Sequence, residues 1–192
     1  MLSIIISGMP AVGKSSVARA VAERFGLKLI TGGDMLKQMA EEKGYKVGGD
    51  DWWDTPEGMA FLQERHSTAR FDHEVDARLE KAVEEGGVVV TSYPLPWLSK
   101  SGVKIWLTAS HQKRARRMAK RDGTPFDEAV KAVAKRDSEN RRLYRKLYGI
   151  KFGEDLSIFD LAVNTDRLQE GDVAEVVCAF IKPLTEKSSV PV

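Results

Sequence analysis

The feature that most constrains the fold is a nine-residue loop, GMPAVGKSS, which runs from Gly8 to Ser16. An apolar run, LSIII, precedes this loop, and the segment VARAVAERF follows it with apolar residues at helical spacing. Short continuous apolar runs are typical of buried parallel strands, whereas the spacing after the loop predicts a helix. A strand that enters a loop containing two glycines and continues directly into a helix indicates an α/β fold.

The loop has the spacing Gly-x4-Gly-Lys-Ser, in which the backbone wraps around a phosphate with its N–H groups pointing inward. The following helix adds partial positive charge at its N-terminus. We expect Lys14 to reach the β- and γ-phosphates of ATP and the Ser15 hydroxyl to bind Mg²⁺. The residues of the loop predicted to bind ATP are Gly8, Ala11, Val12, Gly13, Lys14, Ser15 and Ser16.

The remaining apolar segments alternate with helical patterns. We expect strands over 2–7, 27–30, 88–91, 103–108 and 159–165, and helices over 14–25, 34–43, 56–64, 71–85, 110–121, 125–147 and 171–181. This alternation predicts a parallel, doubly wound sheet of five strands in a three-layer α/β/α fold. Because such sheets bind ligands at the carboxyl ends of their strands, the segments that follow the strands are the candidate site.

The composition excludes several classes of protein. A chain of 192 residues buries a sizeable core without a disulfide or a metal, and its single cysteine, Cys178, cannot form an intramolecular disulfide. No apolar run reaches the about 18 residues of a membrane span, and a secretion signal is not recognised, so we expect a cytoplasmic protein. Only six residues are Asn or Gln, while Glu, Lys and Arg are abundant, which is typical of proteins from hot environments.

Basic residues cluster in HQKRARRMAKR (111–121) and RDSENRRLYRK (136–146), although the net charge is only +2. Two solvated helix faces and an anion-binding lid both explain these clusters. A nucleotide-binding or RNA-associated protein with little turnover is a third possibility. The nearly balanced charge and the lack of a stacking motif argue against a nucleic-acid partner.

Two stretches of the chain resemble known kinases. TGGDMLKQM (31–39) resembles the Gly-Asp-x-x-Arg segment of nucleoside monophosphate kinases, with Lys37 in place of the arginine that contacts the acceptor phosphate. We expect Asp34 to be the N-cap of the helix, with a further role in holding a water on Mg²⁺ or steering the acceptor. The stretch from KRDGTPFDEAVKAVAKRDSENRRLYRKLYGI to LSIFDLAVNTD resembles the archaeal cytidylate kinases, and the resemblance spans most of 2–180.

This resemblance implies an ATP- and Mg²⁺-dependent kinase that converts CMP or dCMP to the diphosphate by in-line transfer. It implies one domain over 1–182, with an acceptor-binding insertion over about 34–85, a lid over about 110–148 and a flexible tail over 183–192. The lid arginines, which neutralise charge and help exclude water, are Arg117, Arg121, Arg136, Arg141 and Arg142. Asn164 and Thr165 are implied beside the donor base.

FDHEVDARL (71–79) resembles the helix on the nucleotide side in the cytidylate kinases. The candidate acceptor-side residues are Lys37, Arg70, Asp72, Arg78, Tyr93 and Arg142. Whether the protein is a monomer or a homodimer stays open.

Residues 91–95, TSYPL, depart from the family pattern. Cytidylate kinases carry an acidic residue and then Gly-Arg here, whereas this chain has Thr91 for the acid and Tyr93 or Leu95 for the arginine. An acidic loop over 48–54 adds Trp52 and Trp53, which either stack on the acceptor or pack on the core. These departures keep a second hypothesis open, a kinase of a non-nucleotide hydroxyl compound with Asp34 as the base.

Overall fold

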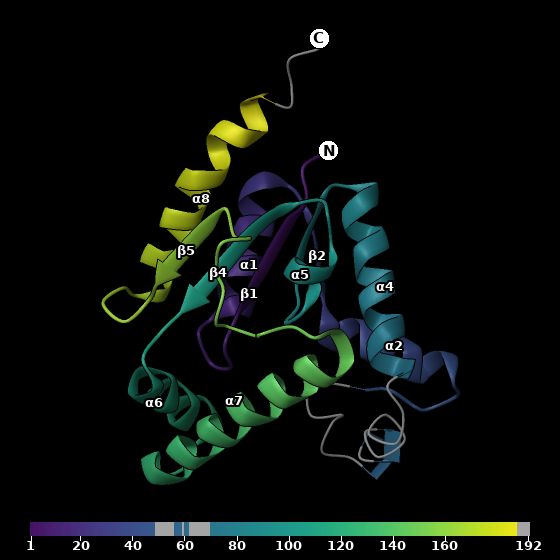
Figure 1. The fold of residues 1–192 in the computed structure, drawn as a ribbon, viewed down its shortest axis with the longest axis vertical. Coiled ribbons are helices and arrows are strands. Elements are labelled where there is room, and N and C mark those ends of the chain that lie inside the picture. Colours follow the sequence, from purple (N-terminus) through teal and green to yellow (C-terminus); the bar gives the residue numbers. More distant parts are fainter. Residues whose placement is uncertain (49–55, 59, 62–69, 188–192) are drawn as a thin grey trace.

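The computed structural model describes residues 1–48, 56–58, 60–61 and 70–187. Within these ranges the strands form one fully parallel, five-stranded sheet in the order β2-β3-β1-β4-β5. The strands are β1 (Ile4–Gly8), β2 (Lys28–Thr31), β3 (Val88–Thr91), β4 (Val103–Thr108) and β5 (Leu161–Asn164). The predicted sheet is therefore confirmed, and β1, which leads into the phosphate loop, lies at its centre (Figure 1).

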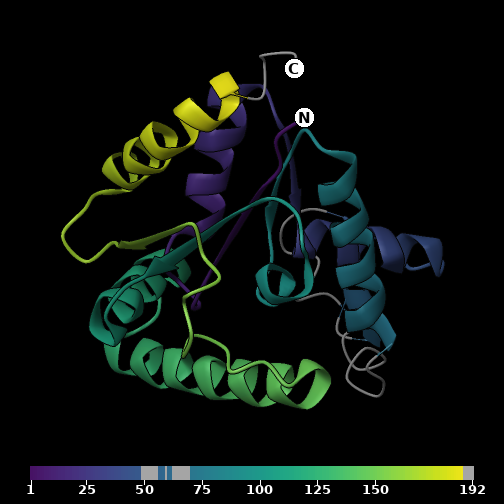
Figure 2. The same ribbon diagram turned by 45° about the horizontal axis from the view of Figure 1, so that its top comes forward.

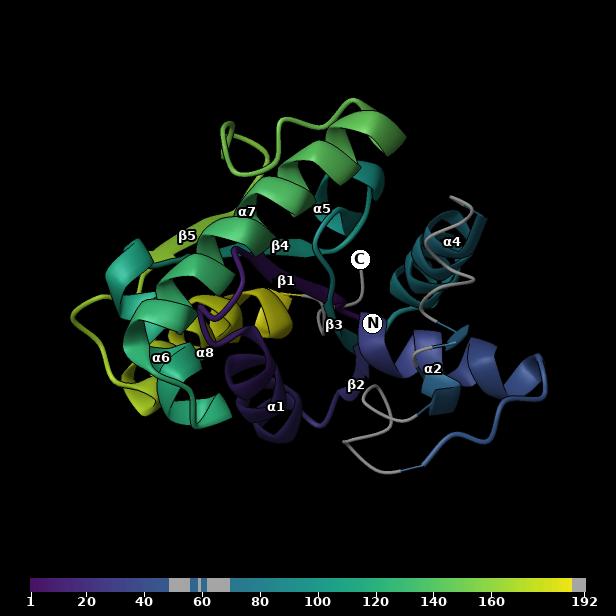
Figure 3. The same ribbon diagram turned by 90° about the horizontal axis from the view of Figure 1, so that it is seen from below.

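Helices cover both faces of this sheet, as Figure 2 shows. In chain order they are α1 (Lys14–Phe25), α2 (Gly32–Glu42), α4 (Arg70–Glu85), α5 (Leu95–Leu98), α6 (His111–Asp122), α7 (Phe126–Tyr148) and α8 (Glu170–Lys187). Helices α6 and α7 lie across the carboxyl ends of the strands, and Figure 3 looks onto α7 from that side. The helix pair predicted as a lid thus lies at the edge of the sheet where ligands bind.

Alternate residues of β1 point into two different cores, as the period of a strand requires. Ile4 and Ile6 join the core that α1 and α8 cover, which contains Val17 and Val177. Ile5 joins the opposite core, which α2 and α4 cover. This alternation gives the three layers of the fold, in which the sheet lies between two layers of helices. All three isoleucines are fully buried.

The lid helices have a small core of their own. Ala115 and Met118 of α6 pack against Ala129 and Val133 of α7, and all four side chains are buried. Gly123 ends α6 with a left-handed backbone, which allows the chain to reverse into α7. The α6–α7 pair is therefore a packed unit rather than two independent helices.

Three differences from the sequence expectation concern the helices α2, α5 and α8. Helix α2 begins at Gly32 rather than at residue 34, because the Thr31 side chain caps it. Helix α5 was not expected, since LPWL is too short to show helical periodicity. Helix α8 continues to Lys187 although Pro183, inside it, lacks the N–H that would donate a helical hydrogen bond. The expected boundary at 183 therefore lies inside a helix.

Part of the insertion expected over 34–85 can be followed in the structure. Residues 56–58 and 60–61 of the predicted helix over 56–64 are helical, and its other residues lie outside the described ranges.

Among the described residues, no helix has an apolar stretch long enough to cross a bilayer.

Candidate active site

The phosphate loop begins where β1 ends, at Gly8, whose φ is 149°. A Cβ atom at this position would lie 2.2 Å from the carbonyl oxygen of Leu107, so glycine is required for the close approach of β1 to β4. Gly13, with φ of 97°, is the N-cap of α1 and provides no capping side chain, and the first turn of α1 holds no acidic residue. The N–H groups of that turn are therefore left for an anion.

Lys14 folds back onto this loop. Its Nζ donates hydrogen bonds of 3.0 Å to the carbonyl oxygens of Gly8 and Met9, and it lies 4.4 Å from the centre of the Tyr93 ring. Burial and, to a smaller extent, repulsion from Arg114 lower the pKa of Lys14 to about 7, and the charge of Asp137 opposes both effects. The ammonium is therefore held in a site that penalises its charge when no anion is bound.

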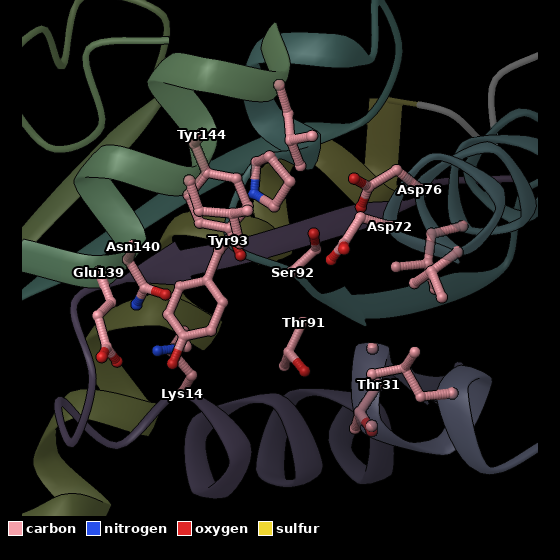
Figure 4. Close-up of a pocket in the computed structure, with 18 of the residues that line it drawn as sticks. Lys14, Thr31, Asp72, Asp76, Thr91, Ser92, Tyr93, Glu139, Asn140 and Tyr144 are labelled. Atoms are coloured by element: carbon pink, nitrogen blue, oxygen red, sulfur yellow. The ribbon is translucent and has the colours of Figure 1, made fainter. Parts of the chain in front are cut away.

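A cleft of about 1040 Å³ opens beside the loop. Lys14 and Ser15 lie at one end of it, and the other walls come from the start of α2, one face of α4, the segment after β3 and one face of α7. Figure 4 shows these side chains converging from elements that are distant in sequence. Ser15 is exposed and Ser16 is half-buried, so the Ser15 hydroxyl is the one presented to the cleft.

One wall of the cleft carries the carboxylates of Asp72 and Asp76, from α4. The Tyr148 hydroxyl, at the end of α7, donates a hydrogen bond of 2.6 Å to Oδ2 of Asp76. Burial raises the pKa of Tyr148, and this bond and the charge of Asp72 raise it further. The bond joins the last turn of α7 to α4 and fixes one carboxylate of the wall.

The opposite wall comes from α7 and includes Glu139, Asn140, Arg142 and Lys146. Of the described residues that line the cleft, the cations are Lys14, Arg142 and Lys146. The cleft is thus lined by carboxylates from α4, by the cation of the phosphate loop, and by two cations and one carboxylate from α7. Such a distribution suits a ligand that carries an anionic group and, elsewhere, hydrogen-bond donors.

Hydroxyl groups line the part of the cleft between these walls. Thr91 and Ser92 are buried at the end of β3, and the Ser92 hydroxyl accepts a bond of 3.3 Å from the N–H of Leu95. The Ser7 hydroxyl donates a bond of 2.9 Å to the carbonyl oxygen of Tyr93. These bonds hold the TSYPL segment against β1 and the start of α5.

Arg114 of α6 connects helices α6 and α7 to the phosphate loop. Its guanidinium makes two parallel bonds of 2.8 and 2.7 Å to the carboxylate of Asp137, on α7, and donates to the carbonyl oxygen of Pro10. Sequence reasoning missed this pair. A signal existed, because Asp137 lies on the same helical stripe as the buried residues Val133 and Tyr144, and a carboxylate on an apolar stripe indicates a buried cationic partner.

Arg117 makes a second connection from α6. It donates to the carbonyl oxygen of Val12, to the Thr165 hydroxyl at 2.8 Å and to the Thr165 carbonyl at 3.0 Å. Thr165 is fully buried, and the side chain of its neighbour Asn164 accepts a bond from the N–H of Asp166. Arg117 therefore joins the phosphate loop to the segment after β5, both of which were predicted to contact the donor.

The model of the cytidylate kinase-like family matches residues 3–167 of the chain. This protein belongs to that family. A cytidylate kinase from Pyrococcus horikoshii is 37% identical over 184 residues, covering 95% of this chain and 90% of the relative. One from Sulfurisphaera tokodaii is 31% identical over 192 residues, covering 96% and 98%. The resemblance inferred from the lid segment is thereby confirmed.

Solved structures agree on the fold of this cytidylate kinase-like chain. An uncharacterised protein from Eubacterium ventriosum superposes with a TM-score of 0.69 at 16% identity, covering 95% of this chain and 98% of that one. A shikimate kinase from Bacteroides thetaiotaomicron gives 0.59 at 16% identity, covering 94% and 98%. At these identities the likeness concerns the fold alone, and it confirms the three-layer architecture.

The predicted lid arginines of this cytidylate kinase-like protein take different positions. Arg142 lines the cleft, whereas Arg117 lies against the phosphate loop. Arg121 is exposed and pairs with its neighbour Asp122. Arg136 and Arg141 are also exposed and are not among the residues that line the cleft.

The predicted acceptor-side residues divide in the same way. Asp72, Tyr93 and Arg142 line the cleft, and Lys37, Arg70 and Arg78 do not. The guanidinium of Arg78 binds Glu42 at 2.7 and 2.6 Å and Glu74 at 2.7 Å, so it connects α4 to α2. Trp52 and Trp53 lie outside the described residues.

Asp34 is not the N-cap of α2, contrary to the sequence expectation. Thr31 is the N-cap, and its hydroxyl accepts a bond of 3.0 Å from the N–H of Asp34. The Asp34 carboxylate in turn accepts bonds from the N–H and the hydroxyl of Thr31. Both residues form a capping box because Gly32 and Gly33 already belong to the helix, which shifts Asp34 to its third position.

Proposed function

We propose that this protein is an ATP-dependent kinase that phosphorylates CMP or dCMP to the diphosphate. One observation carries the proposal: Lys14 and Ser15 of the phosphate loop line the same cleft as the carboxylates of α4 and the cations of α7. Donor and acceptor phosphates would then meet at one end of a single cleft. The relatives named cytidylate kinase cover more than nine tenths of this chain, which supports the choice of acceptor.

ATP fits the loop that these residues form. The uncapped first turn of α1 offers N–H donors to the phosphates, and Lys14 would contact the β- and γ-phosphates. Ser15 would hold Mg²⁺, which neutralises phosphate charge during transfer. The described residues contain no cluster of three or more carboxylate, histidine or cysteine side chains. Coordination by one hydroxyl, phosphate oxygens and waters suits Mg²⁺, which usually retains several waters when it binds.

The α4 wall suits cytosine as the acceptor base. The exocyclic amino group of cytosine is a hydrogen-bond donor, and carboxylates are its usual partners in proteins. Uracil presents an acceptor oxygen at the same position, which a carboxylate repels. Asp72, with Asp76 fixed beside it by Tyr148, would therefore select cytosine over uracil.

The α7 wall would supply positive charge to the acceptor phosphate. Arg142 and Lys146 are one helical turn apart and both line the cleft. Arginine binds phosphate oxygens in pairs, so Arg142 would orient the attacking oxygen. Because the transfer needs little covalent chemistry from the protein, positioning and charge neutralisation would provide the rate.

The test is conversion of ATP to ADP with Mg²⁺ at elevated temperature across a panel of acceptors. The panel contains CMP, dCMP, UMP, AMP and GMP, with sugars, polyols and hydroxy acids as the second class. We expect turnover with CMP or dCMP and its loss in Lys14→Ala. If no monophosphate supports turnover and a hydroxyl compound does, the protein is instead a kinase of that class of compound.

A further inference from the structure

Tyr93 occupies the junction between the phosphate loop and the acceptor cleft. Its ring centre lies 4.4 Å from Nζ of Lys14, and the residue lines the cleft directly after β3 (Figure 4). The Nζ group already donates to the carbonyl oxygens of Gly8 and Met9. The π face of Tyr93 is therefore a further partner of the ammonium.

The ring of Tyr93 is held in this place from several sides. Its carbonyl oxygen accepts a bond from the Ser7 hydroxyl, which ties the backbone to β1. The rings of Tyr144 and Phe152 lie 6.1 and 5.8 Å from it, centre to centre. Burial raises the pKa of the Tyr93 hydroxyl, and the charge of Arg136 and the side chain of Asn140, both on α7, oppose that shift. The phenol is packed rather than free to rotate into solvent.

The charged groups around Lys14 act on its ammonium in opposite directions. Arg114 of α6 repels the ammonium, Asp137 of α7 attracts it, and Glu139 of α7 lines the same cleft. Burial adds a penalty that an aromatic face partly offsets, because a cation over a ring is stabilised most where water is excluded. A second cation at position 93 would instead add to the repulsion from Arg114.

We propose that Tyr93 is a positioning residue whose ring holds the ammonium of Lys14 in place at the phosphate loop. This inference rests on the proposed contact between Lys14 and the donor phosphates. It gives the aromatic side chain at position 93 a function on the donor side of the site. The ring, rather than the hydroxyl, performs this function.

The test measures the affinity for Mg²⁺·ATP, without any acceptor, in Tyr93→Phe and Tyr93→Leu. Phenylalanine retains the ring, so we expect an affinity close to that of the unsubstituted protein. Leucine removes the ring, so we expect about tenfold weaker binding.

Phe159→Leu is the matched control, because Phe159 belongs to the same aromatic cluster but packs on Trp97 and Trp106. Circular dichroism checks that each variant is folded. The inference is overturned if Tyr93→Leu binds Mg²⁺·ATP as tightly as the unsubstituted protein, if Tyr93→Phe and Tyr93→Leu bind alike, or if Phe159→Leu weakens binding as much. Failure of the acceptor panel with unchanged ATP binding would remove the CMP assignment and leave the role of Tyr93 standing.

Discussion

Arg114 and Asp137 form a buried ion pair in which two parallel hydrogen bonds, 2.8 and 2.7 Å long, join the two lid helices. The side chains are only 6% and 9% exposed. Because Arg114 also donates to the carbonyl oxygen of Pro10, the same guanidinium connects both helices to the phosphate loop. Helices α6 and α7 and the phosphate loop are therefore held together by one side chain.

Asp137→Ala should destabilise the protein by about 3–5 kcal/mol, because it leaves a buried guanidinium without its counter-charge. Denaturant unfolding of the variant at neutral pH measures this loss. The double variant Arg114→Met with Asp137→Leu should recover most of the stability, since apolar residues replace both charges. Equal stability of the single and double variants would contradict a pairing role.

ATP binding should take up a proton near pH 8. The pKa of Lys14 is lowered to about 7 by burial in the free protein, so the amine is largely neutral at pH 8. A bound phosphate favours the ammonium and raises that pKa, so the complex holds the proton that the free protein lacks. Calorimetry of ATP binding in buffers of different ionisation enthalpy measures the uptake. Lys14→Met should abolish it, and uptake that persists in that variant would assign the proton to another group.

The sequence predicts the sheet well because each strand is a short apolar run bounded by loop residues. The phosphate loop is equally local, since Gly8, Gly13, Lys14 and Ser15 lie within eight consecutive residues and their spacing determines their placement. In this part of the site, the strand, the loop and the helix lie where the pattern places them. The start of α2 is the exception, because Thr31 and Asp34 could each cap the helix and only the conformation of the two intervening glycines decides.

The lid arginines could not be assigned from sequence in the same way. Residue type gives charge, but it does not tell which arginine faces the cleft and which faces the loop or solvent. Arg117 and Arg142 both match the expected pattern, yet one bonds to the Thr165 segment and the other lines the cleft. Likewise, Arg78 binds Glu42, which is distant in sequence and belongs to another helix. Such pairings depend on tertiary packing.

Arg117→Ala should raise the KM for ATP about tenfold or more while changing the KM for CMP little. The substitution removes bonds from a charged donor to the phosphate loop and to Thr165, each worth about 1.5–3 kcal/mol. Steady-state kinetics with each substrate varied in turn separates the two effects. Arg116→Ala is the control, because Arg116 is exposed on the same helix. A rise in both KM values would indicate collapse of the site rather than a donor-side role.

Asp72→Asn should reduce the preference for CMP over UMP about tenfold. An amide can donate to the uracil oxygen as well as accept from the cytosine amino group, whereas the carboxylate only accepts. The measurement is the ratio of kcat/KM for the two acceptors, which cancels any general loss of activity. Glu74→Gln is the matched control, because Glu74 lies on the same helix and pairs with Arg78. An unchanged ratio in Asp72→Asn would move base recognition to another part of the cleft, with Asp76 as the next carboxylate to test, since Tyr148 already fixes its orientation.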